Sequence, residues 1–365
     1  MMQERSQEIK EKLDFLRSWL GSQEAGVIRL RGIDWFAWVT AGGSNAVLLA
    51  AETGVAEVLV TLAEAYVLTD TIEARRLQDE DVPAGFEWNI VPWAELERRE
   101  RFIASTAAGR PIFSDWPTPP ELPLPPELRN RRLLLLASEQ ARYREVGRRA
   151  AEAMSEVMHA ARPTWTEFEL AGAGAEALWA RGLHPALTLA AGEQRLPRYR
   201  HPTPSSAPLG KEAMLVFCAR GYGLYANLTR FACFSSPDFQ WHRRQAAIRT
   251  VEAAGLKACR PGRRLASVYD ALDRAYAAEG FPQAIEEHHQ GGITGYLARE
   301  VIATARTEIA LETGMAVALN PSLPGVKIED TFLLQADGLE NLTLAPDWPS
   351  IVYEGLPRPL PLEAR

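Results

Sequence analysis

The pattern of apolar and polar positions divides the chain into two regions of different character. The first region begins with charged and apolar residues at helical spacing over 4–20. Short apolar runs bounded by turn residues follow it. A helix followed by such runs predicts a small α/β domain. The runs lie at residues 25–30, 34–40, 45–52 and 56–62.

A proline-rich segment separates this region from the rest of the chain. Residues 114–126 hold six prolines. Proline removes a backbone donor and disfavours helix in the residue before it, so an extended linker is expected here. We place the domain boundary near Arg129, which gives a first domain of residues 1–128 and a second of 129–365.

The second region changes from helices to strands. A long helical pattern over 134–182 has an expected N-cap within residues 163–166. Two strands joined by a glycine-containing loop come next, followed by two helices and by short strands with glycine turns. The order predicts an α+β domain, and the proline-rich tail, residues 354–365, is expected to be a surface extension. The strands are predicted at 213–218 and 224–234 and the helices at 239–260 and 265–279.

Composition restricts the function classes. A formal charge of −7 gives no electrostatic reason to expect nucleic acid or an anionic membrane as partner. No stretch approaches the roughly 18 apolar residues of a membrane span, and the N-terminus lacks the apolar core of a signal peptide. We therefore expect a cytoplasmic protein whose three cysteines are reduced and mostly buried.

Short motifs in the second region resemble those of the pita-bread superfamily, which contains aminopeptidase P, prolidase and creatinase. Leu228-Thr229-Arg230 is similar to the "DITRT" strand of these enzymes, and residues 325–330, Gly-Val-Lys-Ile-Glu-Asp, to their "GVRIED". The motifs occur in the family's order along nearly the whole chain. Three further matches are Arg260-Pro261-Gly262 to "KPG", Gly314-Met315 with Asn320-Pro321 to "GM…EP", and Leu342-Thr343 to the final "LT".

This resemblance implies both a fold and an assembly. A pita-bread domain is expected over 129–365, preceded by a small α/β domain of the creatinase type. Relatives usually pair so that the small domain of one subunit caps the site of the other, which implies a homodimer.

The resemblance also allows the metal ligands to be checked. Active members hold two divalent ions through two Asp, one His and two Glu, whose bridging carboxylates neutralise the closely spaced cations. The second Asp corresponds to Asn227 in this chain. The first falls at Cys218 when it is counted from His201. It falls at Val216 when it is counted back from Asn227, and both registers stay open. The His falls at Gly292 when Glu300 is matched to the family's Glu, and His289 could take its place only with a shift of three residues. The two Glu fall at Asn320 and Glu329.

A single carboxylate cannot compensate the charge of two dications. The stretch 194–237 contains one acid, Glu212, at the entrance of a strand. We therefore expect no metal ion and no cofactor. The alternative is a misaligned motif with the true ligands elsewhere.

Two residues are candidates for catalysis. His201 matches the pocket histidine that serves as acid/base in creatinase, a metal-free relative, and Glu329 matches the substrate-binding Glu. The alternative for His201 is a histidine on a surface loop. Creatinase has a further Glu where this chain has Thr229, so transfer of the creatine reaction is doubtful.

Other residues are candidates for substrate binding. His288 and His289 precede Gly291-Gly292, and adjacent residues on a strand point to opposite faces, so at most one is expected to face the site. Arg299 replaces a family histidine and can bind a carboxylate in a bidentate manner, or else form a salt bridge to Glu300 or Glu329. The remaining candidates are Asn227, Asn320 and Tyr296. Lys327 and Asp330 are candidates for lining the same cavity, but a place at the surface or behind the site is the default expectation for them.

The sequence leaves two main functions open. The first is metal-independent hydrolysis of a C–N bond in a small amino-acid-like substrate. The second is a non-catalytic pseudopeptidase that binds a small molecule, a short peptide or a partner protein. A metal-dependent Xaa-Pro peptidase is disfavoured by the missing ligands.

Overall fold

The computed structural model describes residues 2–23 and 25–363. The chain forms two compact units. One contains the chain up to Arg132 together with Leu136–Glu139, and the other contains Leu133–Leu135 and the chain from Gln140 onward. These units are defined by how densely the chain packs, which does not identify domains of a family. The division into family domains 1–128 and 129–365 therefore stays a prediction.

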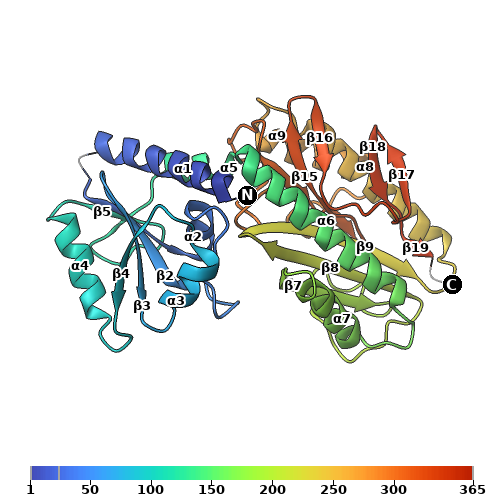
Figure 1. Ribbon diagram of the computed structural model, residues 1–365. Helices are drawn as coiled ribbons and strands as arrows, with labels where there is room; N and C mark the ends of the chain where they lie inside the picture. The colour runs from blue at the N-terminus through green and yellow to red at the C-terminus, as the bar shows by residue number, and fades with distance from the viewer. Residues whose placement is uncertain (1, 24, 364–365) are drawn as a thin grey trace. The chain divides into compact units, whose positions relative to one another are not determined.

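The first unit is built on a six-stranded sheet with the order β4-β3-β2-β1-β5-β6 (Figure 1). The pairs β1·β2 and β2·β3 are antiparallel, and β3·β4, β1·β5 and β5·β6 are parallel. This mixed sheet with helices agrees with the α/β domain that the sequence predicts. Its strands are β1 (Val27–Gly32), β2 (Thr53–Val60), β3 (Ala65–Asp70), β4 (Glu87–Val91), β5 (Ile112–Ser114) and β6 (Leu122–Pro123); its helices are α1 (Met2–Ser22), α2 (Ile33–Val39), α3 (Ala74–Arg76), the π-helical turn η1 (Leu77–Asp81), α4 (Glu97–Ala107) and α5 (Pro126–Leu133).

Two of the four apolar runs are not strands. Residues 34–40 lie mainly in α2, whose Trp35–Val39 are all buried. A short apolar run that is buried on every side has no periodicity to distinguish a helix from a strand. The run 45–52 forms a loop and a turn, and it includes the exposed Val47, Leu48 and Leu49.

The proline-rich segment is not a free linker. It begins at the end of β5 and contains β6, which extends the sheet of the first unit by pairing with β5. Proline is tolerated there because an edge strand needs few backbone donors. The segment also contains bends, a turn and the first residue of α5. The prediction of an extended backbone was therefore correct only in part, and the prediction of a separate connecting segment was wrong.

The second unit begins with helices packed on a four-stranded sheet. Helices α6 (Ala137–Ala160) and α7 (Glu167–Trp179) cover the sheet β19-β9-β8-β7 (Figure 1). Thr166 caps α7 in a capping box with Glu169, which confirms the predicted N-cap. The strands are β7 (His184–Gly192), β8 (Glu212–Gly221), β9 (Leu224–Cys233) and β19 (Leu362–Glu363).

A predicted hairpin forms the centre of this sheet. Strands β8 and β9 pair in an antiparallel register that places Cys218 opposite Asn227. They are joined by Tyr222 and Gly223, whose φ angles of 52° and 81° suit the two-residue turns that match the twist of a hairpin.

The rest of the second unit repeats the arrangement of a helix pair on a sheet. Helices α8 (Phe239–Ala258) and α9 (Leu265–Ala278) pack through a second apolar core against the sheet β11-β10-β12-β15-β16. The strands are β10 (Gly291–Thr294), β11 (Val301–Ile302), β12 (Ala316–Leu319), β15 (Asp330–Gln335) and β16 (Gly338–Asn341), with the hairpins β13 (Ser322–Leu323)·β14 (Val326–Lys327) and β17 (Ser350–Tyr353)·β18 (Leu356–Pro359).

The two sheets meet where β9 approaches the start of β15. The backbone N–H of Thr229 donates to the carbonyl of Glu329 over 3.1 Å, and the N–H of Asn227 donates to Thr331 Oγ1 over 2.8 Å. Asp330 lies behind this junction and accepts from both Arg230 and Arg358 over 2.8 Å. Buried charge pairs therefore fix the register in which Glu329 faces β9.

The C-terminal tail is not a surface extension. Strand β19 pairs with β9, and Arg358 is 1% exposed and pairs with Glu252 as well as Asp330. The prediction was wrong because proline is compatible with short edge strands. Residues 364–365 of the predicted extension lie outside the described part of the chain.

Within residues 2–23 and 25–363, no helix has the length and apolar content needed to cross a membrane.

Candidate functional site

Glu329 is the centre of a buried group of charged and polar side chains. Its Oε1 accepts from Arg299 Nη2 over 2.5 Å, and its Oε2 accepts from Thr229 Oγ1 over 2.9 Å. Lys327 Nζ lies 3.6 Å from Oε2. Glu329 and Lys327 side chains are 2% and 4% exposed, and that of Arg299 is 14% exposed. We call Arg299, Lys327 and Glu329 the charged trio, and its formal charge is positive.

The charged trio keeps Glu329 ionised. Burial alone would raise the pKa of this carboxyl group. The positive charges of Lys327 and Arg299, with hydrogen bonds from Arg299 and Thr229, outweigh burial and lower the pKa of Glu329 to about 2. Arg299 therefore forms the salt bridge that the sequence left open as an alternative to substrate binding, and its partner is Glu329.

A tight loop between β10 and β11 presents Arg299. Glu300 Oε1 accepts the backbone N–H groups of Tyr296 and Leu297 and so closes this loop. Tyr296 is fully buried. It therefore supports the loop from inside, and no contact with a ligand follows from its position. Arg299 also donates through Nη1 to the carbonyl of Ala298 over 2.6 Å, which orients the guanidinium toward Glu329.

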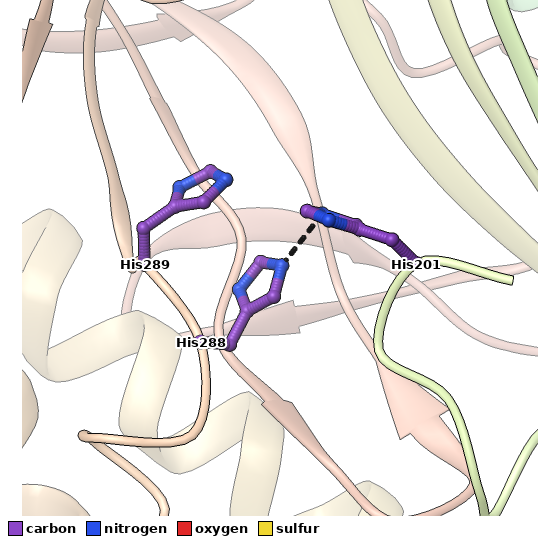
Figure 2. Close-up of side chains that lie close together, drawn as sticks. All are labelled: His201, His288 and His289. Atoms are coloured by element: carbon purple, nitrogen blue, oxygen red, sulfur yellow. Dashed lines mark hydrogen bonds between the residues drawn. The ribbon is translucent and has the colours of Figure 1, made fainter.

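Three histidines from two segments form a second group, which we call the histidine cluster (Figure 2). His201 comes from the segment between β7 and β8, and His288 and His289 come from the segment before β10. The Nε2 atoms of His201 and His288 are 2.8 Å apart. The rings of His288 and His289 stack with centroids 4.5 Å apart, and His289 lies 5.7 Å from His201 by the same measure.

The expectation that His288 and His289 point to opposite faces was wrong. They lie in a bend that precedes β10, where the alternation of a strand does not apply. Both rings contact His201 instead. Sequence reasoning placed them on a strand because the following residues, Gly291–Thr294, do form one.

The histidine cluster and the charged trio influence each other. Burial, followed by the positive charge of Lys327, lowers the pKa of His201. Burial lowers the pKa of His288 to about 3 with help from Lys327, and that of His289 to about 4 with help from Arg299. The three imidazoles are therefore neutral at pH 7, and the charges of the trio act on the histidine rings.

The five positions that the resemblance assigns to metal ligands do not fit a dinuclear centre. Asn227 is buried and donates through Nδ2 to Thr294 Oγ1 over 3.0 Å. At Gly292 a Cβ atom would lie 2.1 Å from the carbonyl oxygen of Val301, so no histidine can stand there without a shift of backbone. Glu329 is already neutralised by Arg299. One carboxylate in a cationic setting is a poor donor set for two dications.

Cys218, one of the two candidates for the first lost ligand, does not supply a thiolate. Burial, followed by the charge of Glu329, raises the pKa of its thiol to about 11. The other candidate, Val216, is buried and apolar. Whether the first family Asp corresponds to Cys218 or to Val216, this position therefore adds no anionic ligand for a metal ion.

Several buried polar atoms of this site lack a hydrogen-bond partner among the described residues. Two are acceptors, Asn227 Oδ1 and Asn320 Oδ1, and one is a cationic donor, Arg299 Nε. A fourth is Nδ1 of His288. Buried polar groups are normally satisfied, so such atoms indicate a place where water or a ligand binds.

Sequence reasoning undervalued Lys327 and Thr229. A place at the surface or behind the site was the default expectation for Lys327, with a place in the cavity as the alternative, and Lys327 lies beside Glu329. The available signal was the spacing: residues 327 and 329 are two apart in an extended segment and share one face. Thr229 was judged only by the carboxylate it lacks, whereas its hydroxyl binds Glu329.

A surface cavity of about 400 Å³ lies elsewhere in the second unit, between the end of α8 and β16. It is lined by Lys257, Arg260 and Asp337 among others and contains none of the predicted site residues. The candidate site is therefore identified by the contacts among its side chains, because this cavity lies outside it.

Comparison with known proteins places the fold. The model of the metallopeptidase family M24 matches residues 141–336. Among solved structures, the chain is similar to an Xaa-Pro dipeptidase from Bacillus anthracis, with a TM-score of 0.77, 18% identity and coverage of 93% of this chain and 98% of the other. It is also similar to the prolidase from Pyrococcus horikoshii OT3, with a TM-score of 0.79, 16% identity and coverage of 92% and 98%.

A third similar structure carries a different description. It is the N-terminal domain of the FACT complex subunit SPT16 from Cicer arietinum, with a TM-score of 0.68, 12% identity and coverage of 94% of this chain and 96% of the other. No curated protein matches the chain in sequence.

Proposed function

From the premise that this chain belongs to metallopeptidase family M24 and has the pita-bread fold of its prolidase relatives, we propose that it binds a small amino-acid-like molecule or short peptide without a dinuclear metal centre. The charged trio takes the place of the two ions in this account. It supplies positive charge through guanidinium and ammonium groups, which bind carboxylates directly.

The unpartnered atoms around the charged trio are the observation that supports this proposal. Arg299 Nε and the ammonium of Lys327 suit a carboxylate, and the amide oxygens of Asn227 and Asn320 suit a group that carries N–H donors. A ligand with both an anionic and an N–H-bearing end matches this set. Amino acids and short peptides are of that class.

Hydrolysis of a C–N bond is the second candidate function. His201 is exposed and neutral at pH 7, and the charges of Lys327, Glu329 and Arg299 act on its ring, so it can act as a general base. Glu329 is less suited to orient a substrate because both of its oxygens already accept hydrogen bonds. The geometry therefore favours ligand binding as the first function, and hydrolysis catalysed by His201 as a second function that requires such binding.

Two other functions receive less support. The Bacillus anthracis structure is described as an Xaa-Pro dipeptidase. A metal-dependent peptidase of that kind would need a donor set for two dications, which the residues at this site do not supply. A pseudopeptidase that binds a partner protein stays open, and the SPT16 domain shows that this fold also occurs within a subunit of a larger complex.

Ligand binding tests the proposal. Chelator-treated protein is titrated with amino acids and Xaa-Pro dipeptides by calorimetry, and the best binder is then offered with its carboxylate amidated. Amidation should abolish most of the binding. Arg299→Ala should weaken binding by about 1.5–3 kcal/mol, the scale of a hydrogen bond to a charged group. Arg144→Ala, at an exposed salt bridge to Glu340, serves as the control.

The histidine variant separates binding from catalysis. His201→Ala should abolish any turnover of the bound peptide and leave its affinity largely intact, because a proton-transfer group acts mainly in the transition state. Binding that is insensitive to both amidation and Arg299→Ala would contradict the proposal.

The homodimer and the cytoplasmic location remain predictions.

A further inference from the structure

We infer that His201, His288 and His289 form a binding site for one transition-metal ion, separate from the dinuclear positions of the family. Each ring offers one nitrogen, and these three nitrogens all lie within 4.8 Å of one another. In Figure 2 the rings of His288 and His289 are turned toward His201. Three imidazoles with an open fourth position are a ligand set that zinc adopts in enzymes.

In the register that places the family His at Gly292, none of the three histidines stands at an ancestral ligand position. Those positions carry Asn227, Gly292, Asn320, Glu329 and either Cys218 or Val216, as set out above. The expectation of no metal rested on these positions and on the scarcity of acids in 194–237. It missed the cluster because His201 and His288 are 87 residues apart in the chain.

The contacts within the cluster are close to those of a metal site. Two nitrogens that are each 2.0–2.1 Å from a tetrahedral zinc ion lie about 3.3 Å apart. The 2.8 Å between His201 and His288 is shorter than this, and the three nitrogens together lie within 4.8 Å, so the rings must adjust to bind one ion. His201 is exposed, so its ring has room to move. The buried Nδ1 of His288 has no partner in the described part of the chain, which leaves the ring free to exchange its proton.

The surrounding charge decides what occupies the fourth position. Lys327, Arg299 and Glu329 all act on the histidine rings, and their sum is positive. A dication alone is therefore disfavoured, whereas a dication with a bound anion is not. The cluster is expected to take zinc together with an anionic fourth ligand such as hydroxide or a carboxylate.

Zinc titration of untagged, chelator-treated protein tests this site without any organic ligand. We expect one Zn²⁺ per chain by calorimetry and a strong visible absorption when Co²⁺ is used as the probe, as for four-coordinate cobalt. Mg²⁺ and Mn²⁺ should not bind, because imidazole sites favour zinc, copper and nickel over these ions.

Single histidine variants identify the ligands. Loss of a direct ligand should exceed the 10- to 100-fold effect of an outer contact, so His289→Ala and His201→Ala should each weaken Zn²⁺ binding by more than about 100-fold. His242→Ala, at an exposed histidine in α8, is the matched control and should bind as the native protein does.

Three outcomes would overturn the inference: no Zn²⁺ binding by folded native protein, equal binding by His289→Ala and His242→Ala, or unchanged Co²⁺ absorption in both His289→Ala and His201→Ala. Circular dichroism of each variant confirms that it is folded. Because no peptide is present, this result is independent of the proposed ligand binding.

Discussion

Replacing Glu329 by glutamine is expected to destabilise the protein by about 3–5 kcal/mol, the effect of removing one partner from a buried ion pair. The substitution leaves Arg299 and Lys327 without a counter-charge at 14% and 4% side-chain exposure. Urea denaturation of native and variant protein measures the difference. Glu340→Gln removes an exposed partner of Arg144 and should cost no more than about 1 kcal/mol.

The pH dependence separates this electrostatic effect from a loss of packing. The pKa of Glu329 is lowered from 4.5 to about 2, so the unfolded chain binds more protons than the native chain between these values. Stability from this group is complete above pH 4.5 and is lost as the pH falls toward 2. The difference between native protein and Glu329→Gln should therefore shrink from about pH 5 to about pH 2.5. A difference that stays constant would mean that the charge of Glu329 does not stabilise the fold.

Asp330→Asn is expected to cost a similar amount, about 3–5 kcal/mol. Asp330 is fully buried and bridges two buried arginines, Arg230 through Oδ1 and Arg358 through Oδ2. Without its charge, Arg358 keeps only Glu252 as an ionic partner among the described residues, and Arg230 has none. The unfolding free energy of the variant measures this effect.

The control for Asp330 lies seven residues further along the chain. Asp337 is exposed in the turn between β15 and β16, so Asp337→Asn should change the stability by less than about 0.5 kcal/mol. Equal effects of the two substitutions would show that the junction between β9 and β15 does not depend on Asp330.

Much of the fold could be predicted because several elements carry local signals. Thr166 and Glu169 form the capping box that begins α7, and the glycine-containing loop after β8 contains the tight turn at Tyr222-Gly223. These signals depend on a few neighbouring residues. Family motifs at 228–230 and 325–330 located the two strands that meet at Glu329.

The elements that could not be predicted depend on contacts between distant residues. The tail is ordered by β9 and by the pairing of Arg358 with Glu252, which is 106 residues away. Residues 35–39 of α2 are all buried, so the alternation of polar and apolar positions that would distinguish a helix from a strand is absent. Local sequence carries no information about such burial.

The sequence named several members of the site and left the salt bridge between Arg299 and Glu329 open as an alternative, but it did not predict how the histidines pair. Motif matching identified His201, Arg299 and Glu329, and the structure joins Arg299 directly to Glu329. That pairing depends on the loop closed by Glu300, which no motif describes. The contact between His201 and His288 likewise depends on the tertiary fold, because the two residues are 87 positions apart in the chain.

The metal content of a His289→Ala variant tests most directly whether the charged trio has replaced the dinuclear centre. The substitution removes one ligand of the proposed zinc site and leaves all five ancestral positions unchanged. The variant is purified without chelator from cells supplied with Mn²⁺ and Zn²⁺, and its ions are counted by mass spectrometry. We expect no stoichiometric metal, and about two ions per chain, the content of a dinuclear site, would contradict the account.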